Sequence, residues 1–298
     1  MTSIPASRSP RTTRRRDARA AAVFLLPAVL FLAFVFFYPI ASVVRTSFLD
    51  PFTDEFAGLA NYRSLFADPI FHAAVVNNLK LVVVLPVLVV TSIVIAQVLH
   101  DQIRGWRVYR AIIFMPYVVP VVVAALVFGQ ILQSRGLVNG LLESVGLGGL
   151  AQNWLGDPKT AVWSVAGVIQ WRELAFGVIL FLARMTQLPE DLYDAAKVDG
   201  ANWWQRLRHV TVPQMSTIIA FYAGIIVVAL FNWVFNYVFV LTKGGPGTST
   251  YVMEYYIYSR AFIYGDFGNA AALSTLMLAA ILAFMVTFLT WLNRRGAL

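Results

Sequence analysis

Six long runs of apolar residues limit what this chain can fold into. A transmembrane helix needs about 20 consecutive, mainly apolar residues, and each run reaches that length with at most two charged residues. Only 13% of all residues are charged, whereas soluble domains carry about 25%. The pattern predicts an all-α membrane protein whose six transmembrane helices lie at Ala20–Val44, Val75–Leu99, Ala111–Leu132, Ala161–Leu182, Met215–Leu241 and Ala270–Leu292.

Lys and Arg are unequally divided between the two sides that these spans define. Fifteen lie on the side of the N-terminus and seven on the other side, with Arg172 inside a span. Because cytoplasmic loops carry the excess of positive charge, both termini and the segment Leu188–Pro213 are predicted to be cytoplasmic. Residues 1–19, rich in Ser, Thr, Pro and Arg, are predicted to be a disordered tail that touches lipid headgroups. Residues 20–298 are predicted to form one transmembrane domain.

Two segments on the predicted outer side carry aromatic patterns. In Gly58–Asn78, apolar residues recur at near-helical spacing, which predicts a helical segment at the membrane surface. The last outer loop contains tyrosines that fit an aromatic belt at the level of the headgroups, namely Tyr251, Tyr255, Tyr256, Tyr258 and Tyr264.

The residues that most catalytic and metal sites require are scattered or missing. The chain has no cysteine, and its three histidines lie far apart. The glycines of Gly244–Thr250 follow Lys243 and no Lys-Ser/Thr pair closes the run, so this segment is not a phosphate-binding loop. Basic residues lie beside the apolar runs, which indicates a membrane protein rather than a nucleic-acid-binding one. No catalytic residue, metal site or cofactor is predicted in this chain, which is therefore not expected to be an enzyme.

The longest charged interval in the second half of the chain is Leu188–Pro213. Pro189 at a first helical position, followed by two acidic residues, predicts a short helix that Gly200 ends by adopting positive φ. A second short helix is predicted over Ala201–His209, and Pro213 then opens the next span. Two capped helices are more than a connection requires. We interpret the interval as a docking surface; the alternative is a solvated loop.

Two adjacent charges lie near the middle of the fourth span. Arg172 and Glu173 point about 100° apart on a helix, so they are not expected simply to neutralise each other. Charges inside a span usually face the bundle interior or water. Either these two groups bind substrate or form a gate, or they pair with a neighbouring helix.

The fifth span contains a second polar group. Asn232 and Asn236 are predicted to lie one turn apart on one face, with Trp233 and Tyr237 on the adjoining face. Amides that bind hydroxyl groups beside aromatic rings suit a saccharide path. The alternative is that the amides join neighbouring helices.

A spaced motif gives a specific resemblance. Asp194-Ala195-Ala196, three residues, Gly200, nine residues and then Val210-x-Val212-Pro213 resembles the E-A-A-x3-G-x9-I-x-L-P signature of permease subunits in binding-protein-dependent ABC importers. Asp194 replaces the usual Glu, which keeps the charge and shortens its reach. The blocks GLANYRSLFADPIF, VDGA, VLTKGGPGTST, YIYSRAF and FGNAAALS resemble the carbohydrate-uptake branch, of the maltose and glycerol-phosphate type. With the Arg-rich tail, they are also similar to permeases of mycobacterial trehalose importers.

The resemblance implies a coupling helix between spans 4 and 5 that sits in a cleft of a cytoplasmic ATPase. It implies four kinds of partner: a second permease subunit, two ATPase subunits, an extracytoplasmic substrate-binding protein or lipoprotein, and membrane lipid. ATP and Mg would bind the partner ATPase, and the complex would lie in a bacterial inner membrane. The coupling residues implied are Glu190, Leu192, Tyr193, Asp194, Ala195, Ala196, Asp199, Gly200 and Pro213.

The function expected from this resemblance is sugar import by alternating access. A di- or oligosaccharide of the trehalose or maltose type is favoured, with glycerol-phosphate or another small polar solute as the alternative. A self-sufficient secondary transporter is the rival class. It would need its own ion-coupling groups, and only Arg172 and Glu173 lie in the middle of a span.

Overall fold

The computed structural model describes residues 23–294, so the predicted tail at residues 1–19 lies outside the described residues. Apart from one isolated bridge between Leu49 and Phe56, the described residues contain no β-structure, which confirms the all-α prediction for them. After an initial helical stretch from Val23, the elements are η1 (Ala33–Phe37), α2 (Tyr38–Thr46), α3 (Ala60–Ala67), α4 (Pro69–Val82), α5 (Val84–His100), α6 (Trp106–Val118), α7 (Val121–Ile131), α8 (Leu137–Ser144), η2 (Gly148–Leu150), α9 (Ala161–Met185), α10 (Glu190–Val198), α11 (Trp203–Arg206), η3 (Leu207–Thr211), α12 (Val212–Gln214), α13 (Ser216–Leu230), α14 (Val234–Leu241), α15 (Met253–Tyr258), η4 (Ser259–Ile263) and α16 (Phe267–Arg294).

Four helices are long and apolar enough to cross a membrane without a sharp bend. Two further helix pairs meet the same criterion only when taken together: α6 with α7, bent by 102°, and Trp203–Gln214 with α13, bent by 75°. Counting each bent pair as one span gives up to six. The four long helices are Val23–Thr46, Pro69–His100, Ala161–Met185 and Phe267–Arg294.

The span predicted at Ala111–Leu132 is a bent pair of helices, α6 and α7, rather than one continuous helix. The run breaks at Val119 and Pro120, where Val119 is extended with ψ of 127°. Proline disfavours the α-conformation of the residue before it and offers no N–H to a helix. Hydropathy does not register this break because the residues on both sides remain apolar.

The span predicted at Met215–Leu241 is likewise interrupted. Helix α13 ends at Leu230 and α14 begins at Val234, so Asn232 lies in the break. A break in apolar surroundings requires partners for the freed backbone groups. Asn78 of α4 supplies one, because its Nδ2 donates to the Leu230 carbonyl oxygen at 3.4 Å.

The second span starts earlier than Val75. Asp68 caps α4 by accepting a hydrogen bond from the Ile70 N–H at 2.8 Å, and Pro69 occupies the first turn. Both features favour a helix start. The predicted surface segment Gly58–Asn78 therefore divides into α3 and the first turns of this long helix.

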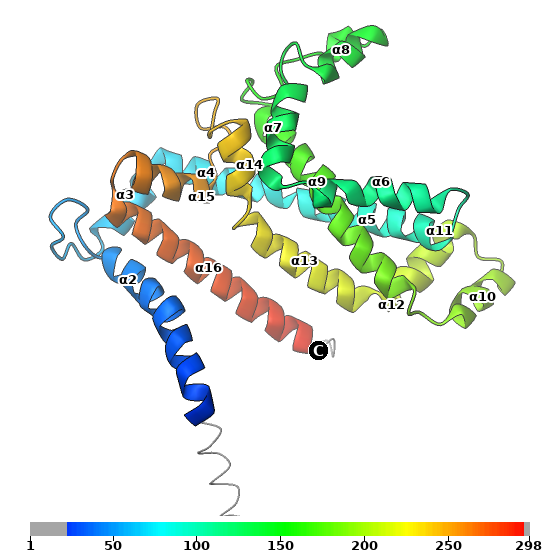
Figure 1. The fold of residues 1–298 in the computed structure, drawn as a ribbon, viewed down its shortest axis with the longest axis horizontal. Coiled ribbons are helices and arrows are strands. Elements are labelled where there is room, and N and C mark those ends of the chain that lie inside the picture. The colour runs from blue at the N-terminus through cyan, green and yellow to red at the C-terminus, as the bar shows by residue number, and fades with distance from the viewer. Residues whose placement is uncertain (1–22, 295–298) are drawn as a thin grey trace, which may run out of the picture.

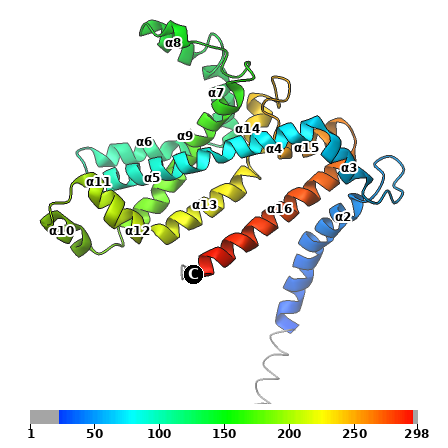
Figure 2. The same ribbon diagram turned by 180° about the vertical axis from the view of Figure 1, so that it is seen from behind.

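Helix α9 lies at the centre of the bundle (Figure 1). It packs against α5, α6 and α13, and its buried Val165, Val178 and Phe181 belong to the main hydrophobic core. The first span, Val23–Thr46, contacts α16 through α2, and its N-terminal part projects away from the body in both the front and the back view (Figures 1 and 2). None of its most apolar stretch is buried. Its surface is thus available to lipid or to another chain.

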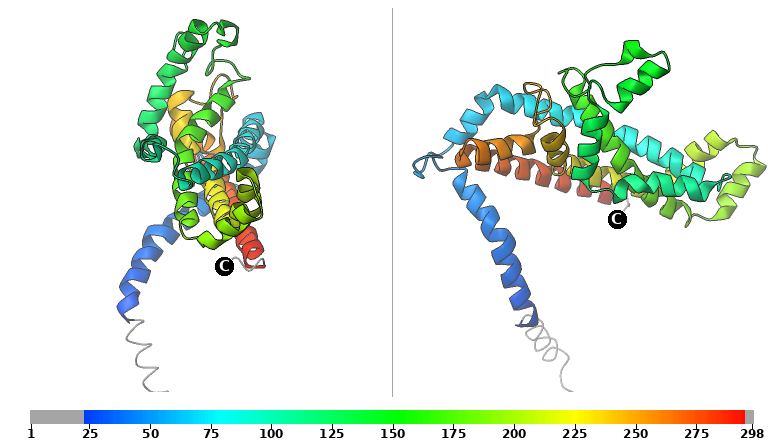
Figure 3. Two further views of the ribbon diagram at one scale, coloured as in Figure 1. Left: turned by 90° about the vertical axis from the view of Figure 1, so that its right-hand side faces the viewer. Right: turned by 45° about the horizontal axis from the view of Figure 1, so that its top comes forward.

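The ends of the molecule are built differently (Figures 1 and 3). Helices α10 to α12 gather at one end of the bundle, where α5 ends and α6 begins. Helices α3 and α15 lie at the opposite end, and α8 projects beyond α7. The predicted docking interval and the predicted outer loops are therefore well separated in space.

Candidate functional site

Helix α10 forms the core of the predicted docking interval. Pro189 is its N-cap rather than its first residue, with φ of −59° and ψ of 128°, and the acidic Glu190 and Asp191 form the first turn. Asp199 is the C-cap, and Gly200 follows with φ of +76°. That left-handed conformation is one that glycine adopts without the steric cost of a Cβ.

Helix α10 has a buried face and an exposed face, and the sequence motif alone does not show which residues belong to each. Tyr193 and Ala196 are buried against the bundle, and their part in coupling stays a prediction. The side chains of Glu190, Leu192, Asp194, Ala195 and Asp199 are exposed. A docking partner would therefore meet this second set.

Buried hydrogen bonds anchor α10 to the second span. The Tyr193 hydroxyl lies 3.2 Å from Thr211 Oγ1, and Thr211 donates to Gln97 Oε1 of α5 at 2.8 Å. All three residues are less than one tenth exposed. Each such bond contributes about 1 kcal/mol to stability, and leaving one partner unsatisfied costs more. Sequence analysis misses Thr211 and Gln97, because Gln97 lies in an apolar run more than a hundred residues away.

The motif carboxylate Asp194 is engaged within its own helix. Lys197 Nζ lies 2.9 Å from Asp194 Oδ1, one turn along, and both side chains are more than half exposed. An exposed pair of this kind contributes less than about 1 kcal/mol. Asp194 can therefore leave Lys197 for an arginine or lysine of a partner at little cost.

The second helix of the interval is longer than predicted. It runs over Trp203–Gln214 and forms the first half of the bent span that α13 completes. Pro213 therefore lies inside this helix rather than at the start of the next span. Asn202, not Ala201, caps it through a capping box in which Asn202 and Gln205 satisfy each other's backbone N–H groups at 2.9 and 2.8 Å. The Trp203 indole donates to Asp101 Oδ2 at 2.7 Å, which ties this helix to the end of α5.

Arg172 and Glu173 form a buried ion pair. Arg172 Nη1 lies 2.6 Å from Glu173 Oε1, and each residue is only 8% exposed. The expectation that adjacent residues do not neutralise each other is wrong here. Both side chains are long enough to bend towards each other across the 100° that separates their Cβ directions.

The pair also touches both broken spans. Arg172 Nε donates to the Val119 carbonyl oxygen at 3.2 Å, at the break between α6 and α7, and its guanidinium lies over the Tyr117 ring at 5.1 Å. Tyr237 of α14 donates to Glu173 Oε1 at 3.2 Å. Arg172 thus supplies a partner for a backbone carbonyl at the break, as apolar surroundings require.

The prediction that Asn232 and Asn236 lie one turn apart on one helix face is wrong, because a break separates α13 from α14 before Val234. Asn232 and Trp233 are exposed in the break, whereas Asn236 is half-buried and Tyr237 is buried in α14. Neither amide forms a side-chain hydrogen bond with another described residue, which argues against their joining helices of this chain. The cavity that Glu173, Trp233 and Tyr237 line holds about 20 Å³. That is the room of about one water molecule, so this cavity cannot hold a sugar.

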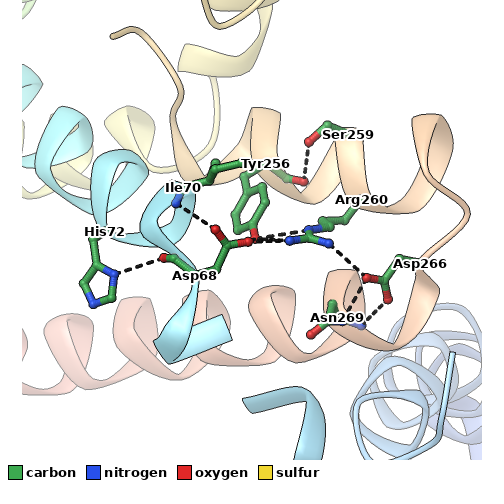
Figure 4. Close-up of polar contacts among 8 residues, drawn as sticks. All are labelled: Asp68, Ile70, His72, Tyr256, Ser259, Arg260, Asp266 and Asn269. Carbon is green, nitrogen blue, oxygen red and sulfur yellow. Dashed lines mark hydrogen bonds and ion pairs between the residues drawn. The ribbon is translucent and has the colours of Figure 1, made fainter. Parts of the chain in front are cut away.

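A polar cluster at the opposite end joins the two halves of the sequence (Figure 4). Asp68, the cap of α4, accepts hydrogen bonds from the Tyr256 hydroxyl and from Arg260 Nη2. Arg260 Nη1 also reaches Asp266 at 3.3 Å, and Asn269 Nδ2 of α16 donates to Asp266 at 2.8 Å. The ends of three helices are therefore held by one group of side chains.

The cluster stabilises the charged form of Asp68, and it shows that two of the predicted belt tyrosines are buried. Burial alone raises the pKa of Asp68, but hydrogen bonds from Tyr256 and the Ile70 N–H and the charge of Arg260 together lower that pKa below its usual value. Tyr255 and Tyr256 are 6% and 1% exposed, so they are not part of a headgroup belt. The sequence shows charges and tyrosines in these loops but not their pairing across 188 and 192 residues.

Within residues 23–294, no three His, Cys, Asp or Glu side chains gather closely enough to hold a metal ion. Residues 81–296 match the family of binding-protein-dependent transport system inner membrane components. The chain belongs to this family. Its membership places the α10 interval and the two broken spans in a multi-pass inner membrane component of a transport system.

Relatives cover nearly the whole of this transport component. It is 37% identical over 268 residues to the probable ABC transporter permease protein YurN of Bacillus subtilis (strain 168), covering 88% of this chain and 91% of that protein. It is 30% identical over 276 residues to the lactose transport system permease protein LacF of Rhizobium radiobacter, covering 88% and 91%. Among solved structures, a bacterial ABC transporter involved in the import of the acidic polysaccharide alginate shares the fold, with a TM-score of 0.82, 22% identity and coverage of 96% and 99%.

Proposed function

We propose that this chain is a permease subunit of an ATP-driven, binding-protein-dependent sugar importer. The observation that carries the proposal is α10, whose inner face is anchored through Tyr193 and whose outer face presents Asp194 and Ala195 at the family motif. A helix with this arrangement can transmit a displacement from a partner on its exposed face to the bundle on its buried face. The partners would be a second permease, two ATPase subunits that hold ATP and Mg, and an extracytoplasmic substrate-binding protein. Both chain termini and α10 would face the cytoplasm.

The substrate proposed is a di- or oligosaccharide. The curated relatives include a lactose permease of Rhizobium radiobacter and the arabinooligosaccharides permease AraP of Bacillus subtilis (strain 168), 29% identical over 271 residues. Exposed Asn232 and Trp233 and half-buried Asn236 supply amides and an aromatic face for hydroxyl-bearing solutes. Trehalose and maltose are the first sugars to test, with glycerol-phosphate as the small-solute alternative.

Alternating access would use the bent spans. Closure of the ATPase pair on bound ATP moves α10, and the Tyr193–Thr211–Gln97 contacts pass that movement to α5. Helix α5 packs along α9, which carries the Arg172–Glu173 pair at the break of the third span. A self-sufficient secondary transporter is disfavoured, because Arg172 and Glu173, the two charges in the middle of a span, neutralise each other at 2.6 Å.

The proposal is tested at the exposed alanine of α10. In cells that express the whole operon, Ala195→Trp is expected to abolish co-purification of the ATPase while the chain remains inserted in the membrane. Gly200→Ala should weaken the association, because a Cβ in the left-handed conformation costs about 1 to 2 kcal/mol. Ala60→Trp, at an exposed alanine of α3 near the other end of the molecule, is the matched control. Normal ATPase recovery with Ala195→Trp would exclude α10 as the docking helix.

A further inference from the structure

A pocket separates the coupling helix from the bundle. It has a volume of about 440 Å³ and lies between the end of α5, the start of α6, the end of α9 and the first turns of α10. Two spans end and a third begins at its rim, at His100, Met185 and Trp106. That is the level at which lipid headgroups meet a transmembrane protein, and basic pockets between helices on the cytoplasmic side bind lipid headgroups.

One wall of the pocket carries an available cation. Arg110 lines it, is exposed, and stacks over the Phe114 ring at 5.4 Å. No carboxylate of the described residues lies within 4.0 Å of its guanidinium nitrogens. Asp101, at the end of α5, is already used, because it accepts hydrogen bonds from Gln97 at 2.9 Å and from Trp203 at 2.7 Å. A guanidinium fork binds a phosphate through two parallel hydrogen bonds.

The opposite wall carries an available anion. Glu190, in the first turn of α10, lines the same pocket and is exposed. Its carboxylate forms no ion pair and accepts no side-chain hydrogen bond from any residue in 23–294. A carboxylate in the same pocket as the phosphate position repels a second negative charge and attracts an ammonium group that can donate to it. The pocket therefore favours a ligand that carries a phosphate and an amine together.

The third wall is apolar and runs towards the membrane. Phe114 of α6 and Ile179 and Leu182 of α9 line it. Beside it, the outward face of α6 exposes Ile112 and Met115 by 63% and 70%. Apolar side chains exposed along a spanning helix are the surface on which acyl chains lie. A ligand seated between Arg110 and Glu190 could extend such a chain along this wall.

We propose that this pocket binds the headgroup of an ethanolamine phospholipid, with the phosphate on Arg110 and the primary ammonium on Glu190. A glycerol headgroup lacks the ammonium, and a choline headgroup has no N–H to donate to the carboxylate. The lipid would bridge the bundle and α10 at Glu190, one turn before the exposed motif residue Asp194. It would therefore help to seat the coupling helix, and its loss would loosen α10.

The test uses the full-length chain in detergent with dioleoyl phospholipids of defined headgroup. Retained lipid is counted by native mass spectrometry, and the melting temperature is followed as each lipid is added. Phosphatidylethanolamine is expected to be retained at least about tenfold better than phosphatidylglycerol or phosphatidylcholine, because only its primary ammonium can donate a charge-assisted hydrogen bond to the Glu190 carboxylate. Stepwise N-methylation of the headgroup should reduce retention progressively in the unmodified protein.

Three variants assign the contacts. Arg110→Ala should lower the retention of all three lipids, whereas Arg107→Ala should leave it unchanged, because Arg107 has the same charge on the same helix but does not line the pocket. Glu190→Gln should retain phosphatidylethanolamine and phosphatidylglycerol about equally. Equal stabilisation of the unmodified protein by all three lipids, or equal losses in Arg110→Ala and Arg107→Ala, would overturn the proposal. If Arg110→Ala does not fold, the methylation series on the unmodified chain decides the question.

Discussion

The buried pair in α9 allows a quantitative test of what holds the middle of the bundle. Arg172 and Glu173 are each 8% exposed, with 2.6 Å between Nη1 and Oε1. Arg172→Met leaves a buried carboxylate without its cation, and Glu173→Gln leaves a buried guanidinium without its anion. Removing one partner of a buried pair costs about 3 to 5 kcal/mol. We expect the lower value for each single change, because Tyr237 and the Val119 carbonyl still contact what remains.

The double variant separates pairing from mere burial. With neither charge present, the remaining loss is that of the hydrogen bonds, so the double variant should be destabilised by about 3 to 4 kcal/mol. Additive single effects would instead sum to about 6 kcal/mol. The coupling energy expected is therefore about 2 to 3 kcal/mol, within the range measured for residues in direct contact.

The assay is reversible unfolding of the purified chain in mixed micelles, followed by circular dichroism as the denaturing detergent fraction rises. The exposed pair Asp194 and Lys197, 2.9 Å apart, is the matched control, and its coupling should stay below about 0.5 kcal/mol. Additivity of the Arg172 and Glu173 changes to within about 0.5 kcal/mol would refute the pairing. The two charges would then act independently, as groups that face substrate would.

Two further predictions concern the proposed substrate surface and the outer cluster. Asn236→Ala should lower sugar-stimulated ATP hydrolysis in the assembled complex without reducing subunit recovery, and unchanged sugar kinetics would remove Asn236 from the path. Because the pKa of Asp68 is lowered in the folded state, its stabilising contribution is complete above its unfolded pKa of about 4 and is lost as the pH falls through the folded pKa. Asp68→Asn should therefore flatten the acid side of a plot of melting temperature against pH, and an acid slope as steep as that of the unmodified protein would contradict this.

The positions of the spans could be read from the sequence because hydropathy is a property of each segment alone. The breaks could not, because they depend on distant partners. Pro120 is visible as a helix breaker, yet the 102° bend also needs the Arg172 contact to the Val119 carbonyl. The break after Leu230 has even less local signal, since its partner Asn78 lies 152 residues away.

The docking interval shows the same division between local and tertiary information. Its helix, caps and Gly200 follow from residue types close in sequence, so α10 was predictable almost to its ends. Which face points inward depends on Thr211 and Gln97, and the motif pattern does not contain that contact. The Arg172–Glu173 contact likewise depends on the length and bending of the two side chains. The angle between their Cβ directions on the helix does not predict it.

Polar contacts connect helix α10 to α5, and the Arg172–Glu173 pair to the two helix breaks. Helices α5 and α9 pack along each other as unbroken rods, and α10 is fixed to α5 by Tyr193 and Thr211. At the middle of α9, one ion pair contacts the break at Val119 and the helix that follows the break after Leu230. A displacement of α10 would therefore move straight helices as units and concentrate backbone change at those two breaks, where dihedral angles can change without disrupting a hydrogen-bonded helix. This transmission requires energetic coupling between α10 and the ion pair. A double-mutant cycle between Tyr193→Phe and Glu173→Gln, with sugar-stimulated ATP hydrolysis as the readout, measures that coupling directly.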